Sequence, residues 1–236
     1  MSTAVGAAAP ARGLRRIVTS TVGLKVIMAL TGTVWILFLL GHMVGNLQIF
    51  AAPEKINAYA AMLHSLGGLL WLVRLFLLAV FVTHVWSAIT LARANRAART
   101  EDYSEKRWLK TSATSRYMMI SGLVVFFFLA YHLAHFTLGV VHGAGAVRGE
   151  AWDVYAMVTQ SFRQPLVAVL YVVANVCVGL HVWHAASSIF QTLGLRTPAY
   201  QPWIDRVGPA LGGLILVGNC AMPLAIWLKI GPFAGL

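Results

Sequence analysis

Six histidines lie within long apolar stretches of this sequence, where ionisable side chains are rare. Four different stretches contribute them: His42, His84, His132, His135, His181 and His184. An imidazole can bind a metal through either ring nitrogen, and an ionisable side chain at membrane depth usually marks a functional site. The pattern predicts metal or haem ligation, with hydrogen bonding between helices and cofactor-free proton relay as the alternatives.

The stretches that contain these histidines are long enough to cross a membrane. Of the 236 residues, 59% are hydrophobic and only 11% charged, a balance unlike that of a soluble domain. About 20 helical residues cross the hydrocarbon core, and five runs qualify: approximately 24–50, 69–92, 116–141, 165–193 and 207–229. Lipid cannot satisfy exposed backbone groups, which favours helices. The sequence therefore predicts an all-α membrane protein with five transmembrane helices, the first four forming a haem-binding bundle.

The basic residues predict how the chain is oriented. Of the 18 lysines and arginines, 13 fall near the same ends of the predicted helices, and basic residues favour the cytoplasmic side. We therefore expect a cytoplasmic N-terminus, with 1–21 as a flexible tail and 22–236 as a single five-helix domain. The basic residues that give the net charge of +11 flank apolar segments. This position points to lipid rather than nucleic acid as the partner. Asn57–His64, on the outer side, could form a short surface helix.

The depths of the histidines suggest that they form pairs. Counting about 1.5 Å per residue from the cytoplasmic ends puts His42 and His132 roughly 25 Å deep, and His84 and His181 roughly 15 Å deep. A b-type haem needs two axial imidazoles facing each other across an apolar slot. Two matched levels therefore predict two stacked, non-covalent b haems, a distal one and a proximal one.

Two histidines duplicate a candidate ligand. His135 and His184 each follow one by three residues, so they lie on nearly the same helix face. We expect them to sit beside a ligand or near the haem propionates. Spacing alone leaves open which member of each doublet, His132 or His135 and His181 or His184, ligates the iron.

Short strings along the helices resemble the cytochrome b membrane anchor of complex II (succinate dehydrogenase and fumarate reductase), in its single-chain, five-helix, di-haem form. The similarity spans about residues 20–230 and rests on these strings: Lys25-x-x-Met28-Ala29-Leu30-Thr31-Gly32, Gly41-His42-Met43-Val44-Gly45-Asn46, Thr83-His84, Ser121-Gly122, Tyr131-His132, and His181 followed by Phe190-Gln191-Thr192-Leu193-Gly194. It implies His42 with His132 at the distal haem and His84 with His181 at the proximal one.

The resemblance also implies a function and partners. Such an anchor lies in the bacterial cytoplasmic membrane and passes electrons from an iron–sulfur subunit through its haems to or from menaquinone or ubiquinone. Such an anchor is one subunit of an enzyme, and the succinate site lies on another subunit, a flavoprotein. Both partners would dock on the cytoplasmic face, and the whole complex could form a higher oligomer. The direction of the reaction is left open.

One position departs from part of that family. Di-haem fumarate reductases that move protons across the membrane have a carboxylate two residues before the fourth ligand, whereas this chain has Gly179. The spans contain no acidic residue, so that relay is in doubt here.

A quinone site needs hydrogen-bond donors and a proton source beside an apolar slot. At the outer face, Glu54 and His64 could supply protons, or they could be solvated loop residues. At the inner face a polar group could bind quinone oxygens or haem propionates: Ser20, Lys25, Ser112, Arg116 and Ser121. Arg116 is the strongest candidate, although it could instead reach lipid phosphate.

Two other functions are compatible with histidines in membrane helices. A haem b anchor of a hydrogenase or formate dehydrogenase would keep the haems and change the partners. A haem-free transporter would use the histidines as a proton relay and would need polar or broken helices along its route.

Overall fold

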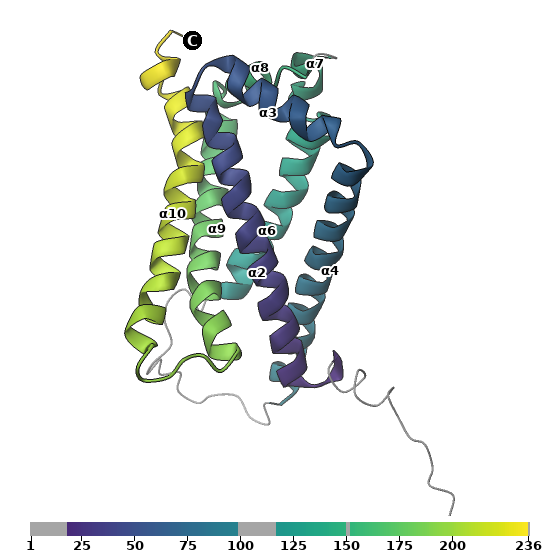
Figure 1. Cartoon of the computed structure of the whole chain (residues 1–236), viewed down its shortest axis with the longest axis vertical. Coiled ribbons are helices and arrows are strands. Elements are labelled where there is room, and N and C mark those ends of the chain that lie inside the picture. The colour runs from purple at the N-terminus through teal and green to yellow at the C-terminus, as the bar shows by residue number, and fades with distance from the viewer. Residues whose placement is uncertain (1–17, 99–116, 150–151, 236) are drawn as a thin grey trace, which may run out of the picture.

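The computed structural model describes residues 18–98, 117–149 and 152–235, and this part of the chain is helical, without strands. Five long apolar helices could cross a membrane (Figure 1): α2 (Thr21–Asn46), α4 (Gly68–Ala97), α6 (Met118–His132), α9 (Pro165–Thr192) and α10 (Gln201–Trp227). The predicted all-α class and the five apolar spans are therefore confirmed. The structure is that of a multi-pass membrane protein.

Two of the helix bounds differ from those expected from hydropathy. Helix α10 begins at Gln201 rather than near residue 207, because its first two turns contain Gln201, Asp205 and Arg206 and so lie outside the apolar run. The third span ends as a π-helical turn, η2 (Leu133–Thr137), and Gly139, with φ of 69°, takes the chain out of the helix before residue 141. Ser112 and Arg116, two of the candidates for binding a quinone or a haem propionate, lie outside the described residues.

The long helices alternate in direction, and α9 contacts α2, α6 and α10, whereas α4 packs on α2. Figure 1 shows α2, α6 and α10 running one way and α4 and α9 the other. Helix α2 packs on both α4 and α9, α6 packs on α9, and α10 packs mainly on the opposite side of α9. The four helices that carry the histidines therefore form one group, with α10 beside it.

Three short helices cap the end of the bundle where α2 terminates (Figure 1): α3 (Pro53–Ser65), α7 (Ala144–Arg148) and α8 (Val154–Phe162). The surface helix expected over Asn57–His64 is part of α3. Asp153 caps α8 by accepting from the Ala156 N–H at 2.9 Å. Asn57 donates to the same carboxylate at 3.0 Å and accepts from the Tyr155 N–H at 2.9 Å, so one amide joins α3 to the start of α8.

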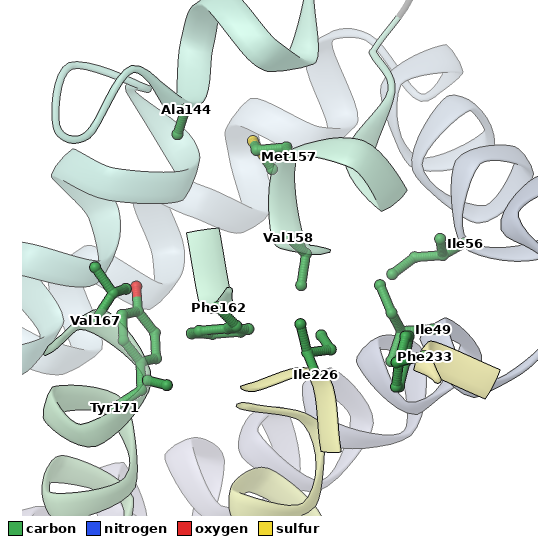
Figure 2. Packing of buried hydrophobic residues seen from close by; sticks show 11 residues of the cluster. Ile49, Ile56, Ala144, Met157, Val158, Phe162, Val167, Tyr171, Ile226 and Phe233 are labelled. Carbon is green, nitrogen blue, oxygen red and sulfur yellow. The ribbon is translucent and has the colours of Figure 1, made fainter. Parts of the chain in front are cut away.

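A fully buried apolar cluster lies beneath this cap. Ile49, Phe162, Ile226 and Phe233 are all 0% exposed, and Figure 2 shows them meeting from separate elements. Burying a side chain of this size contributes about 1.5–3 kcal/mol. The cluster therefore holds the outer end of the bundle together at the level just beyond the outer histidines.

Glycines allow α9 and α10 to approach closely. A Cβ on Gly212 would lie 2.6 Å from the carbonyl oxygen of Gly179 and 2.8 Å from Trp183 Cβ. A Cβ on Gly179 would lie 2.8 Å from Leu216 Cβ. There is therefore no room for a carboxylate at position 179 unless α10 moves away from α9.

We predict that Gly212→Ala lowers the free energy of unfolding by about 1–3 kcal/mol, because the new methyl group must displace backbone on α9. Gly213→Ala is the matched control, since nothing lies within 4 Å of its added Cβ and alanine favours a helix by about 1 kcal/mol. Thermal unfolding in detergent compares the two. Equal melting temperatures would contradict the close α9–α10 contact.

Candidate functional site

The outer histidines meet across the bundle. His42 on α2 and His132 at the end of α6 have ring centroids 5.7 Å apart, with their planes at 89°. Phe38 stacks on His42 with centroids 5.5 Å apart. Two imidazoles bound to one iron have centroids roughly 6 Å apart, because each ligating nitrogen lies about 2 Å from the metal. The spacing of this pair therefore suits two axial ligands of a single haem iron.

The inner histidines are each held by a hydroxyl on a neighbouring helix. Thr31 Oγ1 on α2 lies 3.0 Å from His84 Nδ1, and Ser121 Oγ on α6 lies 3.2 Å from His181 Nδ1. The two helix pairs, α2 with α4 and α6 with α9, thus repeat the same local arrangement.

The hydroxyl protons decide which imidazole nitrogen is free. Thr31 donates to the Ile27 carbonyl at 2.8 Å, and Ser121 donates to the Met118 carbonyl at 3.0 Å. Each hydroxyl oxygen must then accept from the imidazole, so the proton is on Nδ1 and the lone pair on Nε2. A hydrogen-bonded Nδ1–H with an open Nε2 is the usual state of a metal-ligating histidine.

A glycine beside each hydroxyl gives the ring its space. A Cβ on Gly32 would lie 3.4 Å from His84 Cε1, and a Cβ on Gly122 would lie 3.3 Å from His181 Cε1. The dipeptides Thr31-Gly32 and Ser121-Gly122 therefore each hold and make room for a histidine ring, a role that the sequence analysis did not assign. A hydroxyl residue followed by glycine on two histidine-facing helices was the signal available in the sequence.

His135 and His184, the second histidines of the two doublets, already use ring nitrogens in hydrogen bonds. His135 is 0% exposed, and its Nδ1 and Nε2 lie 3.1 Å from Tyr171 Oη and 3.1 Å from Ser161 Oγ. His184 Nε2 lies 3.1 Å from Ser188 Oγ on its own helix. Both nitrogens of His135 are occupied, whereas no described residue bonds His132 Nε2. This difference favours His132 over His135 as the ligand, while His181 and His184 each have one ring nitrogen bonded to a hydroxyl.

Three buried polar atoms near the histidines have no hydrogen-bond partner within the described chain: Trp35 Nε1, Ser87 Oγ and Tyr131 Oη. Such an atom costs about 1–3 kcal/mol unless a ligand or water satisfies it. Ser87 is 0% exposed and follows His84 by three residues on the same face of α4. Ser87 Oγ is therefore a buried hydroxyl on the His84 face of α4 that no described residue satisfies.

The histidine pairs suit a porphyrin better than a bare metal ion. No group of three or more His, Cys, Asp or Glu side chains able to hold a metal ion occurs in the described parts of the chain. A porphyrin supplies four of the six ligands of its iron and needs only two from the protein. Paired imidazoles are sufficient for that coordination and insufficient for a tetrahedral zinc site.

The inner quinone candidates have structural duties or lie at the surface. Ser20 caps α2 by accepting from the Gly23 N–H at 3.0 Å. Lys25 is exposed in the first turn of the same helix. Ser121 is 9% exposed and is used by His181, as described above. These residues therefore do not form a polar cluster around a common ligand in the described chain.

The two outer candidates are not brought together either. Glu54 and His64 lie near opposite ends of α3, roughly 15 Å apart along the helix. His64 instead packs against Trp152 in a tilted contact, with ring centroids 3.7 Å apart and planes at 39°, and the Arg148 guanidinium lies over Trp152 at 4.0 Å. Burial, together with nearby Arg74 and Arg148, lowers the pKa of His64 below its usual 6.5. His64 is therefore neutral at pH 7 and helps to close the cap.

Comparison of the chain with protein-family models, curated proteins and solved structures finds no match. The class of protein therefore follows from the fold, which is that of an all-helical, multi-pass membrane protein. The paired histidines are the feature from which its function must be inferred.

We predict that acid loosens the contact between α3 and Trp152. Because packing lowers the pKa of His64, its stabilising effect is fully present above pH of about 6.5 and is lost as the pH falls through the lowered pKa. Hydrogen exchange of peptides covering Pro53–Ser65 measures this. His64→Gln cannot titrate, so it should lack the extra exchange in acid. An identical pH dependence in both proteins would contradict the prediction.

Proposed function

We propose that this chain is the cytochrome b membrane-anchor subunit of a succinate:quinone oxidoreductase in a bacterial cytoplasmic membrane. In this proposal His42 with His132, and His84 with His181, each hold one non-covalent b haem. When bound, the haems supply one-electron carriers between an iron–sulfur partner and menaquinone or ubiquinone. The chain takes part in catalysis as a subunit, and succinate is bound by a flavoprotein partner.

The observation that carries the proposal is the pairing of imidazoles between helices. The rings of His42 and His132 lie 5.7 Å apart. In His84 and His181, Nδ1 is bonded to a hydroxyl that itself donates to a backbone carbonyl, and no described residue bonds Nε2. A histidine that only joined two helices would be satisfied by that single hydrogen bond, and its second nitrogen would need no partner at the same depth. A close pair at one level, and at the other two rings whose Nδ1 atoms are bonded to neighbouring helices, favour ligation over helix bridging.

Aromatic rings lie between the two levels. Trp35 and Phe81 have ring centroids 5.6 Å apart, and Phe81 and Phe126 have centroids 5.8 Å apart. These residues come from α2, α4 and α6, and along each helix they fall between the inner and outer sites. Large apolar rings exclude water from this layer, which suits neutral histidines and a macrocycle better than the hydrated route a histidine-relay transporter would need.

The basic end of the bundle supports the expected position of the partners. Basic residues gather at the end of the bundle where α2 starts: Arg93 and Arg96 near the end of α4, Arg196 after α9, and Arg206 near the start of α10. Such an excess of basic residues favours the cytoplasmic side. It would also attract an acidic protein surface, as docking of the iron–sulfur subunit requires in this proposal.

The proposal predicts two b haems per chain in the freshly purified, intact complex. A reduced-minus-oxidised spectrum with pyridine haemochrome quantitation measures them, and succinate should reduce at least one. Haems with no response to succinate, together with hydrogenase or formate dehydrogenase partners, would assign the chain to that other class of anchor. Absence of b haem would end the proposal.

A second prediction separates the members of the doublets. His84→Ala should remove only the inner haem, because that variant leaves the outer pair intact. His135→Ala should retain both haems, because its two nitrogens are already bonded to Tyr171 and Ser161. Haem content and the low-temperature spectrum of each variant are the measurements. Loss of the outer haem in His135→Ala would show that the wrong residue of that doublet was chosen.

A third prediction tests the hydroxyl that holds His84. Thr31→Val removes the hydroxyl that accepts from His84 Nδ1–H. Loss of such a bond typically weakens metal binding about 10–100-fold. Thr33→Val is the matched control, because Thr33 bonds only the Ala29 carbonyl of its own helix. Retention of the inner haem during dilution in detergent compares them. Equal retention would show that Thr31 does not support the ligand.

A further inference from the structure

A chain of buried hydrogen bonds leads from His132 out to the cap helix α8. Tyr171 Oη lies 3.4 Å from His132 Nδ1 and 3.1 Å from His135 Nδ1. His135 Nε2 lies 3.1 Å from Ser161 Oγ, which lies 2.7 Å from the Met157 carbonyl oxygen. Tyr171, His135 and Ser161 are 4%, 0% and 4% exposed. Bulk water therefore does not compete for these bonds.

The donor and acceptor of each hydrogen bond between His132 and α8 follow from the last bond, which is made to the Met157 carbonyl. The Met157 carbonyl can only accept, so Ser161 donates to it and its oxygen accepts from His135 Nε2–H. His135 Nδ1 is then a lone pair, which accepts from the Tyr171 hydroxyl. The Tyr171 oxygen is left to accept from Nδ1–H of His132, whose lone pair is on Nε2.

The π-helical turn lets His135 take part. The Leu138 N–H bonds the Leu133 carbonyl at 2.8 Å, five residues back. A wider turn of this kind shifts the residues after His132 out of the α-helical register. The ring of His135 reaches both α8 and α9 as a result, through Ser161 and Tyr171.

We propose that Ser161, acting through His135 and Tyr171, holds His132 in its Nδ1–H form and thereby sets the donor strength of the outer axial ligand. This inference rests on the proposed function. The three residues are positioning residues, because none of them would touch the iron. The inner ligands differ in that each is held directly by one hydroxyl on an adjacent spanning helix.

This arrangement has a measurable consequence for the outer haem. A hydrogen bond donated by Nδ1–H makes the imidazole a stronger electron donor, which favours ferric over ferrous iron. Weakening the chain should therefore raise the midpoint potential of the outer haem. The inner haem should not respond, because Thr31 and Ser121 act on it independently of Ser161.

The experiment uses the intact complex with Ser161→Ala or Tyr171→Phe. Haem content is measured first, and a potentiometric titration then follows the two haems separately. Tyr131→Phe is the matched control, because Tyr131 is in ring contact with Tyr171 and His135 but its buried hydroxyl has no partner in the described chain. We expect a positive shift of the outer midpoint potential in both test variants and none in the control.

Each outcome decides the inference. Two bound haems with an unchanged outer potential in Ser161→Ala and Tyr171→Phe would overturn it and leave the proposed function standing. An equal shift in Tyr131→Phe would also overturn it, because packing alone would then be sufficient. If Tyr171→Phe does not assemble, the smaller change Ser161→Ala decides. Absence of haem in the unaltered complex would remove the proposed function and this inference together.

Discussion

An imidazole buried between membrane helices needs an acceptor for its N–H, because lipid offers none. Most of the site can be traced to this requirement. Thr31 and Ser121 satisfy the inner rings, and Tyr171 satisfies the outer ring of α6. In each case the acceptor bonds Nδ1, and no described residue bonds Nε2. The same bonds that make burial tolerable thus prepare the rings as ligands.

The two levels meet the requirement in different ways. At the inner level a hydroxyl on the neighbouring helix is sufficient, with a glycine behind the ring to make room. At the outer level the bonds continue through His135 to Ser161 on α8, so the cap helices become part of the site. The apolar cluster beneath the cap then has a second role, because it holds α8 in place against the spanning helices.

Helix α10 contributes packing rather than chemistry, and its contact with α9 constrains what the site can contain. Gly179 is two residues from His181 but faces Gly212 and Leu216. A carboxylate there would separate the two helices. If the chain is a complex II anchor, this contact excludes the acidic relay of the proton-moving members at that position.

The sequence by itself determined the helical class and the five apolar spans, because hydropathy is a local property. From the helix rise it also predicted that the histidines lie at two depths. It did not determine which quinone candidates meet, and Glu54 and His64 prove to lie near opposite ends of α3. It also left the doublets open. Only the tertiary structure distinguished His132 from His135, because the π-helical turn breaks the local periodicity and the deciding partners, Tyr171 and Ser161, come from distant helices whose side-chain contacts no local pattern encodes.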